Sequence, residues 1–374
     1  IGTSVAAIST AATTLAFTNS SMTDGDVYIS NDKGDGFSVL VSGSNANANN
    51  ANPGVINITE TTGALTVTAN GITGSGAVTI KSDEGVLLSD VVTGGASSAV
   101  VIDSSAGGSI TRTAGVVTGD TVTLKASGDI GASGNGAAIS TAANTLMFDN
   151  SANNNVYITN AKANGSALLV SGTSSDGNIS IIETEETIKT SGVVSTAGAV
   201  TLEAKKGIEL NHNVTGDVVI IGSTNGSITQ AAGKTVTGTG SVALNAATGI
   251  GESDAAISTV ADTLSFTNST SGGVYVSNAK AIGVSVSGTS AGTGKISVIE
   301  TAGNIVLGDV ITGGDAVTVD STLGSISAAA DDDVVTGTKV TLNADDGIGT
   351  NAQAIFTAAD TLVFHNSANS TGNV

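Results

Sequence analysis

Residues 130–150 read IGASGNGAAISTAANTLMFDN, running from an Ile-Gly pair through small residues to a Leu-x-Phe-x-Asn segment. Three other stretches follow the same pattern, at residues 1–19, 250–268 and 348–366. In the first three copies a second segment follows, which reads Val-Tyr-Ile/Val-Ser/Thr-Asn and occupies residues 27–31, 156–160 and 274–278. A repeat this long predicts a stacked, quasi-one-dimensional architecture, in which each repeat buries its apolar face against its neighbours.

A finer rhythm runs inside each copy. Short segments that alternate apolar and polar residues recur about every 9–12 residues and are separated by turns rich in Gly, Asn, Asp and Ser, which is typical of strands. Examples are ALTVTA at 64–69, AVTIKS at 77–82 and TVTLKA at 121–126. Two such segments give about 20–22 residues, enough for one coil of a β-solenoid. The predicted fold class is therefore all-β, a parallel β-helix with about 20–22 residues per coil.

The spacing of the copies predicts the domain organisation. We expect one continuous solenoid segment of a longer chain over residues 1–374, with repeats 1–129, 130–249 and 250–347 and a partial repeat 348–374. The third repeat has 98 residues against 120 in the second, a difference of 22, which predicts the loss of one coil between Glu300 and Ile305. We expect about six, six and five whole coils, because loss of half a coil would turn inward side chains outward.

The composition predicts a narrow core. Gly accounts for 50 of the 374 residues, Pro for 1 and aromatic residues for 2%, while 40% of the chain is hydrophobic. Small aliphatic side chains must therefore fill the interior. The near absence of proline suits a continuous ladder, because each proline would remove one N–H donor from it. Cysteine is absent, which leaves the compartment open.

The charge balance excludes several partners. The net charge is −20, and the 12 basic residues are scattered, so phosphates of nucleic acid and anionic lipid surfaces are repelled. No apolar run approaches the roughly 18 residues of a membrane span, so we expect no membrane insertion of this segment. Arg112 is the one arginine of the chain. A polysaccharide lyase or hydrolase would need acids clustered with basic residues, so no enzyme is predicted.

Aromatic residues mark the same positions in each copy. Leu-x-Phe places leucine and phenylalanine on one face of a strand, which favours a layer inside the coil. The alternative is a repeated aromatic platform that binds sugars. The positions are Phe17, Phe148, Phe266, Phe364, Tyr28, Tyr157 and Tyr275.

One acidic group is a candidate metal site. Asp24, Asp26, Asp32 and Asp35 lie around the first Val-Tyr segment, and Ca²⁺ prefers several oxygen ligands around one point. The spacing is not that of an EF-hand, and the second and third copies lack the group. Solvated loop carboxylates are the alternative. We expect no other cofactor.

Three segments resemble a known family. They are TVTLKASGDIG at 121–131, SVALNAATGIG at 241–251 and VTLNADDGIG at 340–349, each followed by a Leu-x-Phe strand, and GSITR at 108–112 and GSITQ at 226–230 accompany them. They resemble the repeats of filamentous-haemagglutinin-type exoproteins, which are very large bacterial surface adhesins of a two-partner-secretion-like kind. The resemblance implies a right-handed parallel β-helix, secretion across an outer membrane and a place at the cell surface.

These observations predict a structural extracellular β-solenoid that forms the shaft of a bacterial adhesin or fibre. Two alternatives stay open: a self-assembling filament subunit, and a module that displays glycan or Ca²⁺ sites on a β-helix. The expected partners are other copies of the chain, through lateral or end-to-end association, or glycans of the cell surface or matrix. Exposed strands at the end of a stack are templates for such association.

Overall fold

The computed structural model describes residues 1–20, 25–34, 36–46, 53–134 and 136–367. The chain divides into two compact units. Unit 1 comprises Ile1–Glu186 and Thr196–Gly198, and unit 2 comprises Thr187–Ser195 and Ala199–Val374. Every regular element in the described ranges is a strand, and in each unit the strands pair in parallel with those of the coils before and after. The predicted all-β parallel β-helix is confirmed.

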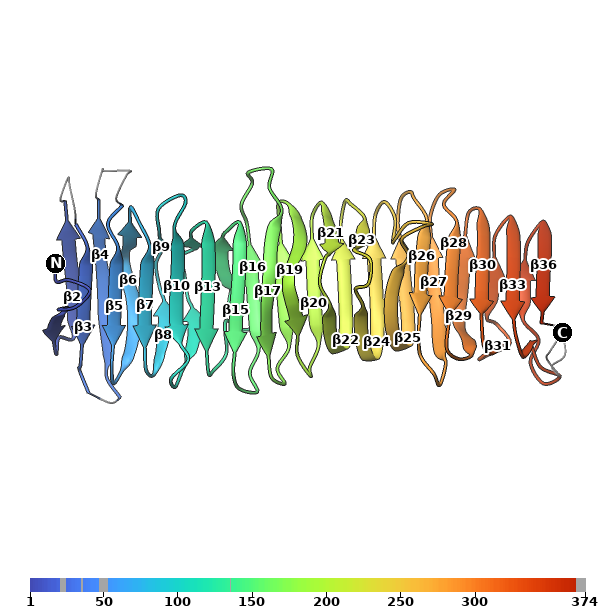
Figure 1. The fold of residues 1–374 in the computed structure, drawn as a ribbon, viewed down its shortest axis with the longest axis horizontal. Helices are drawn as coiled ribbons and strands as arrows, with labels where there is room; N and C mark the ends of the chain where they lie inside the picture. The colour runs from blue at the N-terminus through green and yellow to red at the C-terminus, as the bar shows by residue number, and fades with distance from the viewer. Residues whose placement is uncertain (21–24, 35, 47–52, 135, 368–374) are drawn as a thin grey trace. The chain divides into compact units, whose positions relative to one another are not determined.

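Unit 1 is built from two columns of strands, stacked one coil upon the next (Figure 1). The column that begins at Phe17 contains β2 (Thr14–Asn19), β4 (Ser38–Asn45), β6 (Ala64–Gly74), β8 (Gly85–Leu88), β9 (Val92–Thr93), β11 (Ser109–Arg112), β12 (Val117–Thr118), β14 (Ile139–Ala142), β16 (Val156–Asn160) and β18 (Ile179–Glu183). The column that contains Tyr28 consists of β1 (Ile8–Thr10), β3 (Val27–Asn31), β5 (Ile56–Glu60), β7 (Val78–Ser82), β10 (Ala99–Ser104), β13 (Thr121–Ala126), β15 (Thr145–Asn150) and β17 (Leu168–Ser174).

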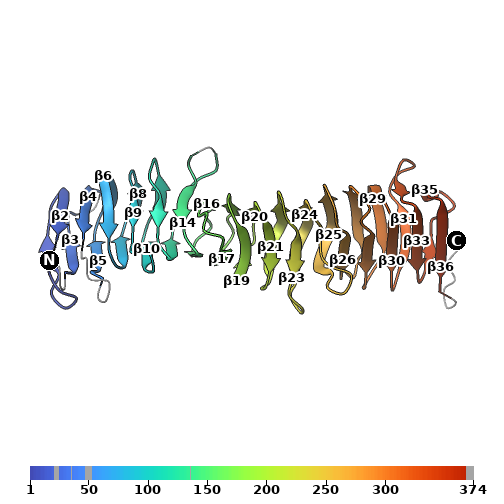
Figure 2. The ribbon, with the colours of Figure 1, turned by 90° about the horizontal axis from the view of Figure 1, so that it is seen from above.

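Unit 2 repeats this plan (Figure 2). The Phe266 column contains β20 (Val200–Ala204), β22 (Val214–Ser223), β24 (Val236–Ala246), β25 (Ile257–Asn268), β27 (Val284–Ser290), β29 (Ile305–Gly313), β31 (Ser325–Ala328), β32 (Val334–Thr336), β34 (Gly347–Ile348) and β35 (Phe356–Ala358). The Tyr275 column contains β19 (Thr187–Ser195), β21 (Gly207–Leu210), β23 (Ile228–Gln230), β26 (Val274–Asn278), β28 (Ile296–Glu300), β30 (Ala316–Ser321), β33 (Lys339–Ala344) and β36 (Thr361–Asn366). The first residues of β22, β24 and β25 also belong to it.

The core is a stack of like residues in register. Ile56, Val78, Val100 and Val122 pair with one another at intervals of 22 residues, and all four are fully buried. Burial of one such side chain contributes roughly 1.5–3 kcal/mol to folding. Loops between the strands change the interval without changing the register. It reaches 29 residues between Val27 and Ile56.

The copies differ from the predicted whole-coil counts. In the Tyr28 column, β15, which contains Phe148, lies five coils after β3. Phe17 is on β2, which belongs to the other column and precedes β3 by half a coil. The first copy therefore spans five and a half coils. In unit 2, β36 with Phe364 lies four coils after β26, so Phe266 and Phe364 are four and a half coils apart.

The expectation that half a coil would reverse the side chains was therefore wrong. Both columns direct alternate residues into the same core. A segment can therefore move from one column to the other and still point its apolar residues inward. In consequence, equivalent aromatics alternate between the columns: Phe17 shares its column with Tyr157, and Tyr28 shares its column with Phe148. The shortening of the third copy by one coil agrees with the observed difference between five and a half and four and a half coils.

Left-handed backbone is concentrated at glycine. Asn70 is the one non-glycine residue with positive φ in the described chain, at 81°, and Gly71 follows it at 59°. The pair forms a bend inside β6, where a Cβ on Gly71 would lie 2.3 Å from the carbonyl oxygen of Val91.

Candidate functional site

The repeated phenylalanines are core residues that pack under a glycine. Phe17, Phe148 and Phe266 are 8%, 3% and 2% exposed. Each faces a glycine in register on the next strand of its column: Gly43, Gly172 and Gly288, respectively. A Cβ on any of these glycines would lie within 2.6 Å of the ring. The ring is too thick for the spacing between coils unless the neighbour lacks a side chain. The prediction of an inner aromatic layer is confirmed for these three.

The tyrosines lie on the outer surface. In each Val-Tyr-Ile/Val segment the aliphatic residues are buried, and Tyr28, Tyr157 and Tyr275 between them are half-buried. Tyr28 and Tyr157 belong to different columns of unit 1. A single row of tyrosines along one strand column therefore does not form in unit 1.

A buried asparagine and glutamate form a hydrogen-bonded pair in each of the first three copies. The asparagine ends the Val-Tyr segment, and the glutamate ends the strand of the next coil in the same column. The amide Nδ2 donates to the carboxylate Oε2 over 2.5–2.6 Å, and all six residues are at most 2% exposed. The pairs are Asn31–Glu60, Asn160–Glu183 and Asn278–Glu300.

The third pair illustrates the full network, which joins three successive coils. The Asn278 side chain accepts from the N–H of Ala261 over 3.0 Å and donates to its carbonyl over 3.2 Å. The hydroxyl of Thr259 donates to Asn278 Oδ1 over 2.8 Å. Glu300 Oε1 accepts from the backbone N–H groups of Lys280 and Ala302, over 2.9 and 2.8 Å. All the partners of this carboxylate are N–H donors, which match an acceptor-only group.

This network is a structural clamp that sequence reasoning missed. Asparagine was expected to act in turns, but no partner for it was foreseen. The signal was present: Ile-x-Ile/Val-x-Glu-Thr occurs at residues 56–61, 179–184 and 296–301, once per copy. Glutamate among apolar strand residues is unusual because an unpaired buried carboxylate is costly, and three occurrences at one place in the repeat indicate a common partner.

The acidic residues proposed for Ca²⁺ are only partly described. Asp26 and Asp32 lie at opposite ends of β3, about 20 Å apart along an extended strand. Asp26 accepts from the N–H of Val55 over 2.9 Å, and Asp32 accepts from the hydroxyl of Thr62 over 2.7 Å. Asp24 and Asp35 lie outside the described residues. Among the residues that are described, no three His, Cys, Asp or Glu side chains form a cation site. Ca²⁺ binding stays a prediction.

Charged residues alternate along the outer surface of unit 1. Lys81, Asp103, Lys125 and Asp149 occupy the same register position on β7, β10, β13 and β15. Burial alone would raise the pKa of Asp103. The hydroxyl and backbone N–H of Ser105 donate to its carboxylate over 2.6 and 3.0 Å, and with Lys81 and Lys125 they lower this pKa below its ordinary value.

Replacement of Asp103 by asparagine tests this row of charges. Because the pKa of Asp103 is depressed in the folded chain, its ionised form stabilises the fold above the ordinary aspartate pKa of about 4. That contribution is lost as the pH falls through the lower, folded-state value. We expect Asp103→Asn to reduce the free energy of unfolding by about 0.5 kcal/mol or less at neutral pH, because the site is partly exposed. Urea unfolding of the original chain and of Asp103→Asn across the acid range measures this difference in the free energy of unfolding. A difference that persists at the lowest pH would contradict a stabilising role of the ionised Asp103.

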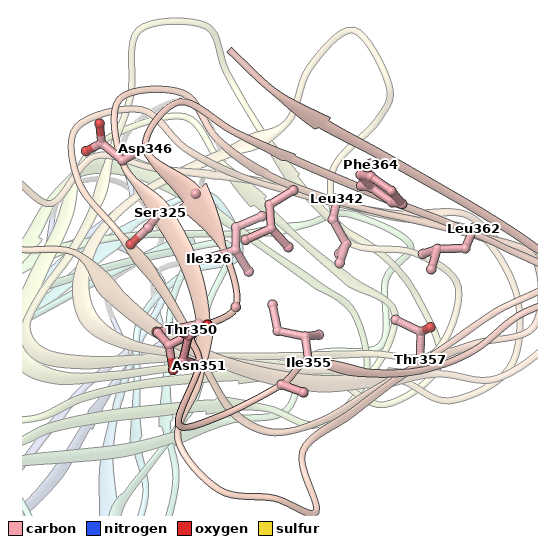
Figure 3. Close-up of a pocket in the computed structure, with 15 residues that line it drawn as sticks. Ser325, Ile326, Leu342, Asp346, Thr350, Asn351, Ile355, Thr357, Leu362 and Phe364 are labelled. Carbon is pink, nitrogen blue, oxygen red and sulfur yellow. The ribbon is translucent and has the colours of Figure 1, made fainter. Parts of the chain in front are cut away.

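The last coil of unit 2 exposes an apolar cavity (Figure 3). The cavity has a volume of about 610 Å³ and is lined by residues of β31, β33, β34, β35 and β36. Ile326, Leu342, Ile355 and Leu362 border one shared space in the close-up. Phe364, the fourth of the repeated phenylalanines, lies at its edge and is 51% exposed, unlike its three equivalents.

The described ranges hold no helix that could cross a membrane. Comparison with known proteins found no matching family model, no similar curated protein and no similar solved structure.

Proposed function

We propose that this chain is a structural segment of an extracellular fibre, the shaft of a bacterial surface adhesin. One observation supports this function above others. The elements that recur in the first three copies, the Phe–Gly contact and the Asn–Glu pair, both join one coil to the next. The repeated residues therefore serve the continuity of the stack.

The mechanism of such a shaft is mechanical. Hydrogen bonds between parallel strands run along the stacking direction in each unit, and the buried aliphatic stack follows the same direction. Each added coil extends the length and buries the apolar face of its neighbour. Loops of different length are accommodated outside the ladder, so they can vary without altering the shaft.

The extracellular, bacterial location rests on the sequence resemblance. Residues 121–131 and 241–251 resemble repeats of filamentous-haemagglutinin-type exoproteins. The net charge of −20 favours solubility of a long fibre and disfavours binding to nucleic acid. As partners we propose glycans of a cell surface or matrix, or other copies of the chain.

Electron microscopy of the native material, combined with the mass of the intact polypeptide, tests the proposal. We expect long rods with an axial repeat of about 4.8 Å, the spacing of neighbouring strands. Antibodies raised against the chain should label the surface of intact cells. Rods assembled from separate chains of 374 residues would instead support the filament subunit, and compact particles or purely internal labelling would overturn the shaft proposal.

A further inference from the structure

Four charged residues of alternating sign lie in one row on the outer face of unit 1. They occupy the same register position on four neighbouring strands of the Tyr28 column (Figure 1). The order along the row is Lys81 on β7, Asp103 on β10, Lys125 on β13 and Asp149 on β15. All four residues are exposed or half-buried. Neighbouring strands are about 4.8 Å apart, so the sign of the charge changes with every coil.

The outward residues beside this row are uncharged, and together with the row they form what we call the alternating face. The two parallel rows on the same strands consist of Thr79, Val101, Thr123 and Met147, and of Ala99, Thr121 and Thr145. The charged row itself continues to Thr59 on one side and to Thr173 on the other. The alternating face therefore has no net charge, although the chain as a whole carries −20.

The fold does not require this alternation. In unit 2 the row that begins at Ser277, the equivalent of Ser30, reads Ser277, Ile299, Asp320 and Asn343. The row in unit 1 also begins at Ser30 and reaches Lys81 two coils later. The alternating charges are therefore a local property of unit 1 and not a product of the repeat.

We propose that the alternating face binds the same face of a second copy of this chain, with the two stacking directions opposed. A row of four alternating charges has the opposite sign at every position when it is reversed. A two-fold axis that runs parallel to the strands, between β10 and β13, would place Lys81 against Asp149 of the second copy and Asp103 against its Lys125. Each contact would occur twice, as in any two-fold interface.

The position of the row on the strands selects this direction. The charged residues lie four positions after the Ala99 row on each strand, so the charged row is at one side of the face. If the two copies ran in the same direction, a two-fold axis along the stack would reverse the strands. The charged row would then lie over the Ala99 row, and the charges would face uncharged residues. Only opposed copies bring the charged rows together, and complementary charges favour one arrangement over others.

The association should be weak for a single pair of chains. Exposed ion pairs contribute about 1 kcal/mol or less each, and small side chains such as Ala99 and Thr121 bury little apolar surface. The inference rests on the proposed association between copies of the chain, and it adds the face and the relative direction.

Variants that rearrange the four charges without changing the net charge test the proposal. Lys125→Asp combined with Asp149→Lys gives a row that reads the same in both directions, so every charge would face a like charge in the second copy. Exchange of the sign at all four positions restores the alternation. Sedimentation equilibrium at about 0.15 M salt should show a dimer of the original chain and of the fourfold variant, with dissociation at least about tenfold stronger for the double variant. Equal association of the three proteins, or no association of the original chain, would overturn the proposal.

Cross-linking determines the relative direction of the two copies and keeps the original charges. The chain has no cysteine, so Thr79→Cys and Met147→Cys each introduce a single thiol on the alternating face. In opposed copies position 79 faces position 147 of the second copy, whereas two positions 79 are offset by three coils, about 14 Å along the stack. A short bis-maleimide added to an equal mixture of the two variants should therefore give mainly 79–147 links between chains, identified by mass spectrometry of the linked peptides. A majority of 79–79 and 147–147 links would overturn the opposed arrangement.

These results are separable from those on the shaft function. The measurements use the purified chain, so the absence of a dimer or of 79–147 links would remove the inference and leave the surface labelling of intact cells unaffected. Purely internal labelling of cells, together with a dimer that shows the expected links, would remove the shaft function and retain the interface.

Discussion

Gly288→Val is expected to destabilise unit 2 by about 3 kcal/mol or more, because valine cannot share the space between two coils with a buried phenylalanine. A Cβ at position 288 would lie 2.5 Å from ring carbons of Phe266, which is 2% exposed and has no room to turn aside. Either the ring or β27 must move. Both are held in place, because β27 pairs in register with β25 on one side and with β29 on the other. Urea unfolding measures the loss, and faster hydrogen exchange in β25 and β27 locates it.

The matched control is Gly222→Val on β22, an outward position of the same unit. A Cβ there meets only the flexible side chain of Glu203, at 3.4 Å, and valine suits a strand. We expect no loss of stability. In the background of Gly288→Val, Phe266→Leu should recover at least about 1 kcal/mol, since it removes the ring and the two positions are in contact. A neutral Gly288→Val, or the absence of such recovery, would contradict the role given to glycine.

Asn278→Asp is expected to cost about 3–5 kcal/mol at neutral pH, because it places a second carboxylate against a buried one without changing the shape of the side chain. Asn278 Nδ2 donates to Glu300 Oε2 over 2.6 Å, and both residues are fully buried. In the variant the two acids cannot both ionise at low cost, so at least one carboxyl would have a pKa above its unfolded value. The protonated form of that carboxyl therefore stabilises the variant fully below about pH 4, and this stabilisation is lost as the pH rises. Urea unfolding across the acid to neutral range measures this trend.

Asn343→Asp is the surface control for this substitution. Asn343 Nδ2 donates to Asp320 Oδ2 over 3.1 Å, and both residues are half-buried on the outside of unit 2. The variant again places two carboxylates side by side, but solvent and salt screen them, so the cost should be about 1 kcal/mol or less and should shrink with added salt. If the two variants cost the same, or if the cost of Asn278→Asp is unchanged between acid and neutral pH, the buried clamp is not what holds these coils together.

The half-coil offset between copies has a consequence for any surface function. Because one copy advances by five and a half coils in unit 1, Tyr28 and Tyr157 occupy different columns, although their sequence neighbours are nearly identical. A ligand site built from one copy would therefore be displayed alternately on the two columns. The core residues are unaffected, because both columns contribute the same inward pattern to one interior.

The sequence by itself determined the class of fold and the length of a coil. Alternation of apolar and polar residues is a local property with a period of two, and turns rich in glycine and asparagine mark its limits, so residues such as Val78, Ile80, Val100 and Ile102 could be assigned to strands and to the core directly. The same period favoured an inward direction for Phe17, Phe148 and Phe266 without deciding it, and the structure shows that all three rings are buried.

Only the tertiary structure decided which strands are neighbours, because register between coils depends on loops whose length the local pattern does not set. The interval between paired residues is 29 at Val27 and Ile56 but 22 at Ile56 and Val78. The glycine that covers each phenylalanine and the asparagine that pairs with each buried glutamate lie about one coil away from their partners in sequence. The half-coil offset between copies likewise depends on the lengths of the loops. These contacts and the offset became visible once the ladder fixed which residues face each other, since hydrogen bonds and ring contacts act only over a few ångströms.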